Sequence, residues 1–140
     1  MYKDKSIFIK ILLVIWQLPQ VITGLLVLLL FRKYEVYTNP YNHISVWKVN
    51  HKGLFGTACF SSGPIIFVTP KAQELILLHE TGHSKQSMIQ GPFFHLFVSI
   101  PSICLFWYRR IKKKSDYWYH SKWPESQANK FSNIDLSVYK

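Results

Sequence analysis

The feature that most constrains the fold is a nearly unbroken apolar run from Ile7 to Phe31. About 20 apolar residues are enough to cross a bilayer as a helix, so this run predicts a transmembrane helix over residues 7–31. Gln17, Pro19 and Gln20 interrupt the run. Such breaks are tolerated in lipid only where neighbouring protein satisfies the polar groups, so we expect this side of the helix to pack against the rest of the molecule.

The charge of the chain also favours a membrane. The 140 residues are enough for one domain, and they include 17 Lys and Arg against 7 Asp and Glu, a net charge of +10. Long apolar runs alternate with basic clusters, whereas a nucleic-acid-binding protein carries its basic charge on a soluble fold. We therefore expect the lipid bilayer, and not nucleic acid, to be the partner of these charges.

A second apolar segment covers residues 92–108, and Pro101 divides it. Its length is marginal for a span, so a short transmembrane helix, a re-entrant hairpin and an interfacial segment all remain open. A basic run follows it, which the positive-inside rule would place on the cytoplasmic side. This run consists of Arg109, Arg110, Lys112, Lys113 and Lys114.

The region between the two apolar segments divides into a β part and a helical part. Residues 34–70 contain turn formers between short β-branched runs, and Ser45–Val49 and Ile65–Thr69 are typical of strands. We expect a small hairpin or meander there. Residues 71–90 have a helical pattern that stops at Gly91-Pro92.

The helix expected at 71–90 carries His79-Glu80-Thr81-Gly82-His83, a match to the H-E-x-x-H pattern of zinc peptidases. Positions i and i+4 share one face of a helix, so both imidazoles can reach one metal ion, with Glu80 beside them to move a proton. Gln86 could line the same site or simply lie on a polar helix face. A catalytic zinc site takes three protein ligands and keeps a fourth position for water, so one more ligand is required.

The third ligand must come from another part of the chain. We favour Glu125 because it opens a helix-like segment in which Asn129 follows at i+4 and can accept the N–H of a ligand imidazole. If residues 92–108 spanned the bilayer fully, His83 and Glu125 would lie near opposite faces. A shared metal therefore requires a re-entrant segment or a site buried below the headgroups. The other candidates are His95, Asp116, His120 and Asp135.

These motifs resemble the gluzincin arrangement of thermolysin and of Ste24-type membrane-embedded peptidases, in which a Glu in an E-x-x-x-D segment completes H-E-x-x-H. They resemble more closely a group of small bacterial membrane proteins with a His-Glu-x-Gly-His-x-x-Gln helix, a Gly-Pro stop and a later Glu-x-x-Ala-Asp/Asn. Here these elements are His79–Gln86, Gly91-Pro92 and Glu125–Asn129. The resemblance covers roughly residues 63–129 and implies an integral protein of the bacterial inner membrane.

One position departs from the gluzincin pattern. Gluzincins usually carry Asp where this chain has Asn129. An amide oxygen can orient a ligand imidazole, but it adds no negative charge, so we expect zinc binding with reduced ligand basicity.

The implied activity is that of a membrane-bound zinc metalloendopeptidase that acts on a peptide or on a membrane protein. Zinc would polarise the peptide carbonyl and activate a water molecule, while Glu80 would take the water's proton and pass it to the leaving amine. His120 or Tyr119 would stabilise the oxyanion. The substrate could bind as an added strand beside residues 65–68, or this strand could be covered and merely pack on the helix. The expected zinc ligands are His79, His83 and Glu125.

Two alternatives remain. A site-2-type intramembrane protease also uses H-E-x-x-H, but it takes an Asp from a downstream transmembrane segment, and nothing acidic occurs in residues 92–110. A non-catalytic zinc-binding membrane scaffold would keep the ligands and hydrolyse nothing. In each case the expected fold is mainly α and membrane-embedded, with a C-terminal helix within residues 115–140.

Overall fold

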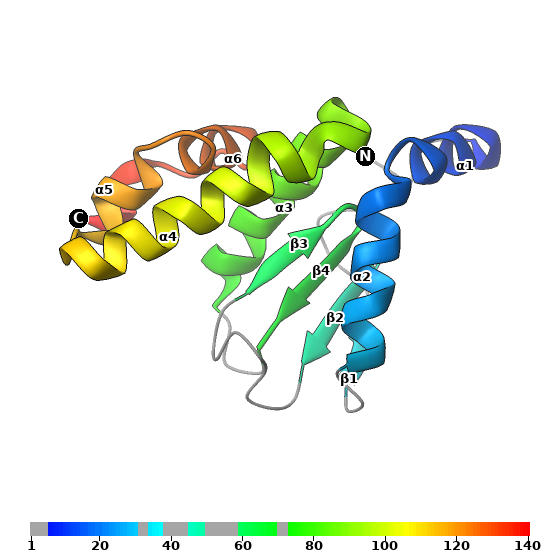
Figure 1. The fold of residues 1–140 in the computed structure, drawn as a ribbon, viewed down its shortest axis with the longest axis horizontal. Coiled ribbons are helices and arrows are strands. Elements are labelled where there is room, and N and C mark those ends of the chain that lie inside the picture. The colour runs from blue at the N-terminus through cyan, green and yellow to red at the C-terminus, as the bar shows by residue number, and fades with distance from the viewer. Residues whose placement is uncertain (1–5, 31–33, 38–44, 50–58, 70–72) are drawn as a thin grey trace.

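The computed structural model describes residues 6–30, 34–37, 45–49, 59–69 and 73–140. These residues form a mainly helical protein with one small sheet (Figure 1). The helices are α1 (Ile7–Trp16), α2 (Leu18–Leu30), α3 (Glu74–Gln90), α4 (Ile100–Lys112), α5 (Asp116–His120) and α6 (Glu125–Phe131). The strands are β1 (Tyr34–Tyr37), β2 (Ser45–Val49), β3 (Phe60–Ser62) and β4 (Ile65–Val68). The short helical segments are η1 (Gly91–Phe93), η2 (His95–Ser99) and η3 (Leu136–Tyr139).

The sheet is more complex than the hairpin or meander that the sequence predicts. Its strand order is β1-β2-β4-β3, and the β2–β4 pair is parallel while the two outer pairs are antiparallel. The β3–β4 hairpin turns at Gly63, whose φ of 63° suits a residue without a Cβ. Parts of the expected β region, residues 38–44 and 50–58, lie outside the described residues.

Strand β4 lies in the interior of the sheet, so residues 65–68 offer no free edge to a substrate strand, and the alternative of a covered strand is confirmed. It pairs with β2 on one side and with β3 on the other. Among the described strands, β3 ends the sheet order next to β4. Any peptide that adds to this end of the sheet would therefore pair with β3.

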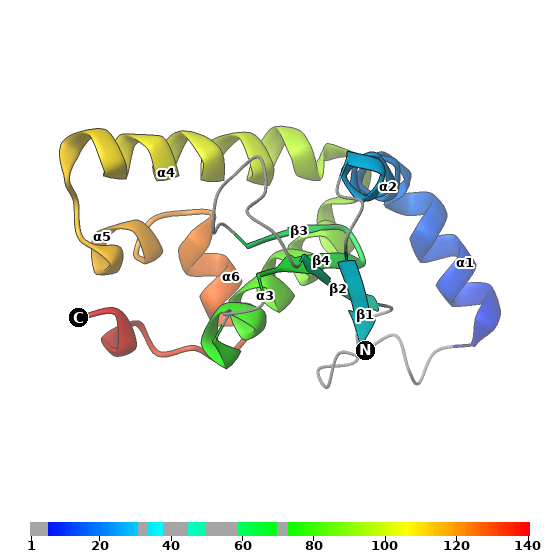
Figure 2. The same cartoon turned by 90° about the horizontal axis from the view of Figure 1, so that it is seen from below.

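The sheet is packed between two helices, which explains why β4 is apolar at every position. Ile65 and Phe67 pack with Leu28 of α2, whereas Ile66 and Val68 contact Leu77 of α3 on the opposite face. Successive side chains of a strand point to opposite faces, so the side chains of β4 pack alternately against α2 and against α3. Figure 2 shows α2 and α4 in one layer and α3 on the far side of the sheet.

The N-terminal apolar run is not the continuous helix expected over residues 7–31. It forms α1 and α2, which meet at a bend of 80°. Among the residues that the structure describes, no single helix has the length and apolar character to span a bilayer, although this bent pair meets both criteria when taken together.

Polar side chains at the bend explain its geometry. Gln17 and Gln20 are fully buried. The hydroxyl of Ser87 donates to Gln17 Oε1 at 2.9 Å, and Gln20 donates to the carbonyl of Gly91. The expectation that this side packs against the rest of the molecule is confirmed, and its partners include the last turn of α3.

Residues 91–112 form a nearly continuous helical run through η1, η2 and α4. Pro101 falls in the first turn of α4, where its missing N–H disrupts no hydrogen bond of that helix. The chain reverses after Lys113, whose φ is 49°, and α5 and α6 return beneath α4 (Figure 2). Because α6 packs directly on α3, the segment at 92–108 does not separate His83 from Glu125.

Candidate metal centre

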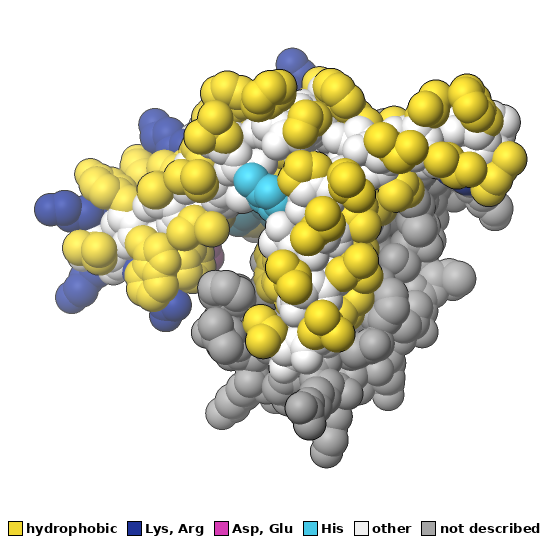
Figure 3. All heavy atoms as spheres, turned by 45° about the vertical axis from the view of Figure 1, so that its right-hand side comes forward, with side chains coloured by type: hydrophobic (Ala, Val, Ile, Leu, Met, Phe, Trp, Pro, Cys, Tyr) yellow, Lys and Arg dark blue, Asp and Glu magenta, His cyan; other side chains and the backbone are white. Residues whose placement is uncertain are grey.

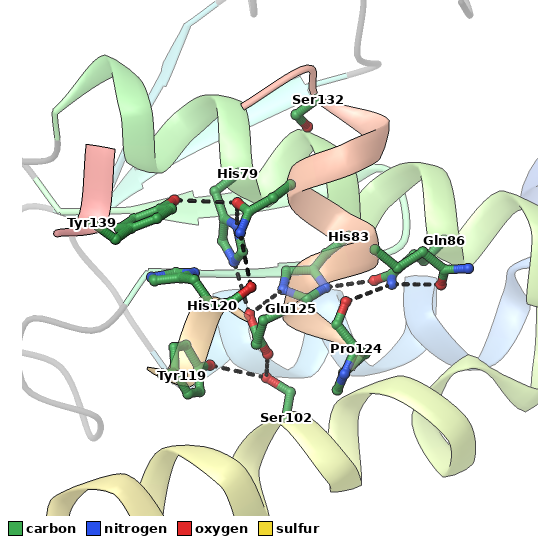
Figure 4. Close-up of polar contacts among 12 residues, drawn as sticks. His79, His83, Gln86, Ser102, Tyr119, His120, Pro124, Glu125, Ser132 and Tyr139 are labelled. Carbon is green, nitrogen blue, oxygen red and sulfur yellow. Dashed lines mark hydrogen bonds and ion pairs between the residues drawn. The ribbon is translucent and has the colours of Figure 1, made fainter. Parts of the chain in front are cut away.

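Three predicted ligands meet where α3 crosses α6 (Figure 4). His79 and His83 lie one turn apart on α3, and Glu125 is the first residue of α6. Nε2 of His79 is 2.9 Å from Oε2 of Glu125, and Nε2 of His83 is 3.1 Å from the same oxygen. All three side chains are buried, so these atoms converge on a site largely shielded from water.

A glycine allows the two helices to come this close. A Cβ built at Gly82 would lie 2.1 Å from the carbonyl oxygen of Ala128, well inside any allowed contact. The backbones of α3 and α6 therefore touch at this point. The hydroxyl of Ser132 also donates to the carbonyl of Leu78 across the same contact. Gly82 thus brings the first turn of α6, with Glu125, within reach of the histidines.

Each of the two histidines has an amide oxygen at its other ring nitrogen. Nδ1 of His79 is 2.8 Å from Asn129 Oδ1, the contact that the sequence predicts, and Nδ1 of His83 is 2.7 Å from Gln86 Oε1. The Gln86 amide nitrogen donates to Gln127 Oε1 at 2.8 Å and to a backbone carbonyl, so its oxygen must face His83. Nδ1 of each imidazole therefore carries the donating hydrogen, which makes Nε2 the ring atom that can hold either a proton or a metal ion.

This arrangement fits a zinc ion. Two nitrogen lone pairs and a carboxylate oxygen repel one another unless a proton or a metal cation lies among them. Tetrahedral zinc with bonds of about 2.0–2.1 Å places its ligand atoms about 3.3 Å apart. The observed separations of 2.9 and 3.1 Å need only a small expansion to reach that value. His79, His120 and Glu125 also offer ligand atoms within 4.8 Å of one another.

Without a metal, His83 and the Glu125 carboxylate stabilise each other's charged forms. Burial alone would raise the pKa of Glu125, but His83 and His79 hold it well below its usual range. Burial disfavours the charged form of His83, yet the Glu125 carboxylate outweighs this effect and raises the pKa of His83 to about 9. The metal-free site thus favours a proton on His83 where a cation would bind.

Glu80 lies beside this cluster and is itself buried. Burial raises its pKa, while His83 and His79 oppose the shift. Its Oε2 has no hydrogen-bond partner among the described residues, and the backbone N–H of Ser61 on β3 donates to its carboxyl group. A buried carboxylate with one free oxygen and a raised pKa has the properties of a general base.

His120 and Tyr119 lie together beside the cluster, with their ring centroids 4.9 Å apart. The His120 ring is 4.8 Å from that of His79 and stacks on Tyr139 at 3.7 Å. Burial is the main cause that lowers the pKa of His120 to about 3, and the nearby His79 adds to it, so the His120 ring is neutral. Its Nδ1 has no hydrogen-bond partner among the described residues. The Tyr119 hydroxyl lies 3.3 Å from Ser102 Oγ, behind Glu125, and burial raises its pKa.

The remaining candidate ligands have other partners. His95 contacts Thr23 and Ser99, Asp116 pairs with Arg109, and Asp135 caps η3. Sequence patterns assign no role to Ser102 or Tyr139, and they leave the role of Gln86 undecided. For Gln86 a signal did exist, because position i+3 from His83 lies on the same helix face.

Comparison of the chain with known protein families, with curated proteins and with solved structures finds no match.

Proposed function

We propose that this protein is a membrane-bound zinc metallopeptidase of the gluzincin-like type, with His79, His83 and Glu125 as ligands. The observation that carries the proposal is the convergence of two histidine nitrogens on one carboxylate oxygen. The amide oxygens of Asn129 and Gln86 support it, because they leave both Nε2 atoms free for a metal. Glu80 places a carboxylate beside the ligands, as hydrolysis requires.

The residues around the ligands suit peptide hydrolysis. Zinc bound there would supply a Lewis acid for the peptide carbonyl and would lower the pKa of a water molecule. Glu80 would take the water's proton with its unpartnered oxygen and pass it to the leaving amine. His120, neutral and next to His79, would donate a hydrogen bond to the developing oxyanion, with Tyr119 as the second candidate.

The substrate peptide would bind in extended form along β3. An exposed strand edge recognises a peptide mainly through its backbone, which suits an enzyme that accepts many sequences. The Ser61 N–H that contacts Glu80 belongs to β3, so a peptide added there would pass the general base.

Metal analysis tests this proposal directly. The purified wild-type chain should hold one zinc ion, and Glu125→Ala should lose most of it because a single buried oxygen completes the ligand set. Glu74→Ala, on the exposed first turn of α3, is a matched control that should keep its zinc. Zinc content that is equal in wild type and Glu125→Ala would contradict the assignment of the third ligand.

The surface supports attachment to a lipid bilayer. Apolar side chains cover α1, α2, η2 and α4 on the face shown in Figure 3. They are strongly exposed, with Leu29 and Leu30 of α2 at 75% and 69% and Phe97 of η2 at 50%. An apolar surface of this extent is typical of contact with a membrane or with another protein. The basic residues at the end of α4 favour anionic lipid.

The basic run should control how tightly the protein binds vesicles. We expect replacement of Lys112, Lys113 and Lys114 by Gln to weaken binding to anionic vesicles on the order of 10²-fold, since each such charge contributes about 1 kcal/mol. Co-sedimentation with phosphatidylcholine vesicles, with and without phosphatidylserine, measures this effect. The variant and the wild type should bind equally to the neutral vesicles. A variant that loses nothing on the anionic vesicles would argue against a headgroup role.

A further inference from the structure

Ser102 lies on the inner face of α4, opposite the apolar surface of that helix. Its hydroxyl donates to Glu125 Oε1 and lies 3.3 Å from the Tyr119 hydroxyl (Figure 4). Its neighbours Ile103 and Trp107, in contrast, are 55% and 56% exposed. One helix therefore presents hydrocarbon on one side and a single hydroxyl to the carboxylate of the metal centre on the other.

The two oxygens of Glu125 have different surroundings. Oε2 faces Nε2 of both histidines, whereas Oε1 faces Ser102. A carboxylate can bind a metal through one oxygen or through both, and a hydrogen bond on one oxygen favours binding through the other. Since Glu125 is fully buried, water cannot easily replace a lost donor.

We infer that Ser102 is a positioning residue that makes Glu125 bind the metal through Oε2 alone. This inference rests on the proposed function, because it requires a metal at His79, His83 and Glu125. The metal centre then depends on α4, although this helix contributes no ligand. The hydroxyl fixes the rotation of the carboxylate and leaves one coordination position for water.

The test compares wild type, Ser102→Ala and Ser102→Thr as full-length chains in the same vesicles. Zinc affinity is measured by competition with a chelator, and the cobalt-substituted proteins are examined by visible absorption. Ser102→Ala should bind zinc about 10–100-fold more weakly, the range found when the hydrogen-bond partner of a ligand is removed. Its cobalt bands should also weaken, because Oε1 becomes free to bind and raises the coordination number.

Ser102→Thr keeps a hydroxyl on the same carbon and should restore both the affinity and the spectrum. Ser99→Ala is the matched control. It removes a hydroxyl from the same helical run, but this hydroxyl contacts His95 and not Glu125. An unchanged affinity and spectrum in Ser102→Ala would overturn the inference, as would a loss that Ser102→Thr fails to restore. If the wild type itself binds neither zinc nor cobalt, the proposed function fails as well.

Discussion

Glu80→Gln should abolish peptide hydrolysis while the protein keeps its zinc. Glu80 is not among the three converging ligands, and Gln has nearly the same size and can still accept the Ser61 N–H. An amide cannot take a proton from water, so the expected loss of turnover is roughly 10²–10⁴-fold, the usual contribution of general acid–base catalysis. The measurements are cleavage of a fluorogenic peptide library and zinc content per chain.

Glu74→Gln makes the same chemical change on the same helix, in its exposed first turn, and should leave turnover unchanged. The result also separates the enzyme from the non-catalytic scaffold. A non-catalytic scaffold that carries Glu80→Gln would keep its function in the cell, whereas a peptidase with the same change would lose it. Full turnover in Glu80→Gln would rule out Glu80 as the general base.

Gly82→Ala should remove the metal and destabilise the fold. The added Cβ would lie 2.1 Å from the Ala128 carbonyl oxygen, and this atom belongs to the backbone, which cannot rotate away. Overpacking of this kind costs about 1–3 kcal/mol and sometimes more. The helices must separate, which draws Glu125 away from His79 and His83. Zinc content and the midpoint of thermal unfolding measure the two effects.

Gly24→Ala provides a matched control on α2. Its Cβ would also be crowded, at 2.9 Å, but the contact is the end of the Ile65 side chain, which can change its rotamer. This variant should keep its zinc, whatever small change in stability it shows. Equal zinc affinity in Gly82→Ala and Gly24→Ala would mean that the contact between α3 and α6 does not set the metal geometry.

The sequence predicted the parts of the site that depend on local geometry. The spacing of His79 and His83 is fixed by the helical repeat, and the same repeat places Asn129 one turn after Glu125. The need for a third ligand comes from zinc chemistry, not from topology. The structure brings Glu125 to both histidines, although 46 residues separate it from His79.

The rest depends on contacts between distant segments. In the sequence, Gln17 is only a polar interruption, and its hydrogen bond with Ser87, 70 residues away, has no local signal. The interior position of β4 follows from a parallel pairing with β2, which the alternation of apolar residues within one strand cannot reveal. A serine in an apolar segment, such as Ser102, also has no local signal, because its partner Glu125 lies on α6.

The two-sided character of α4 has a practical consequence for purification. If the protein binds lipid and zinc as proposed, a detergent that replaces the lipid on the outer face of α4 would shift this helix, and the Ser102 hydroxyl on its inner face would move with it. Metal could then be lost during extraction from a protein whose ligands are all intact. Zinc stoichiometry should therefore be measured in vesicles before and after solubilisation, and a low value in detergent alone should not be taken as the native state.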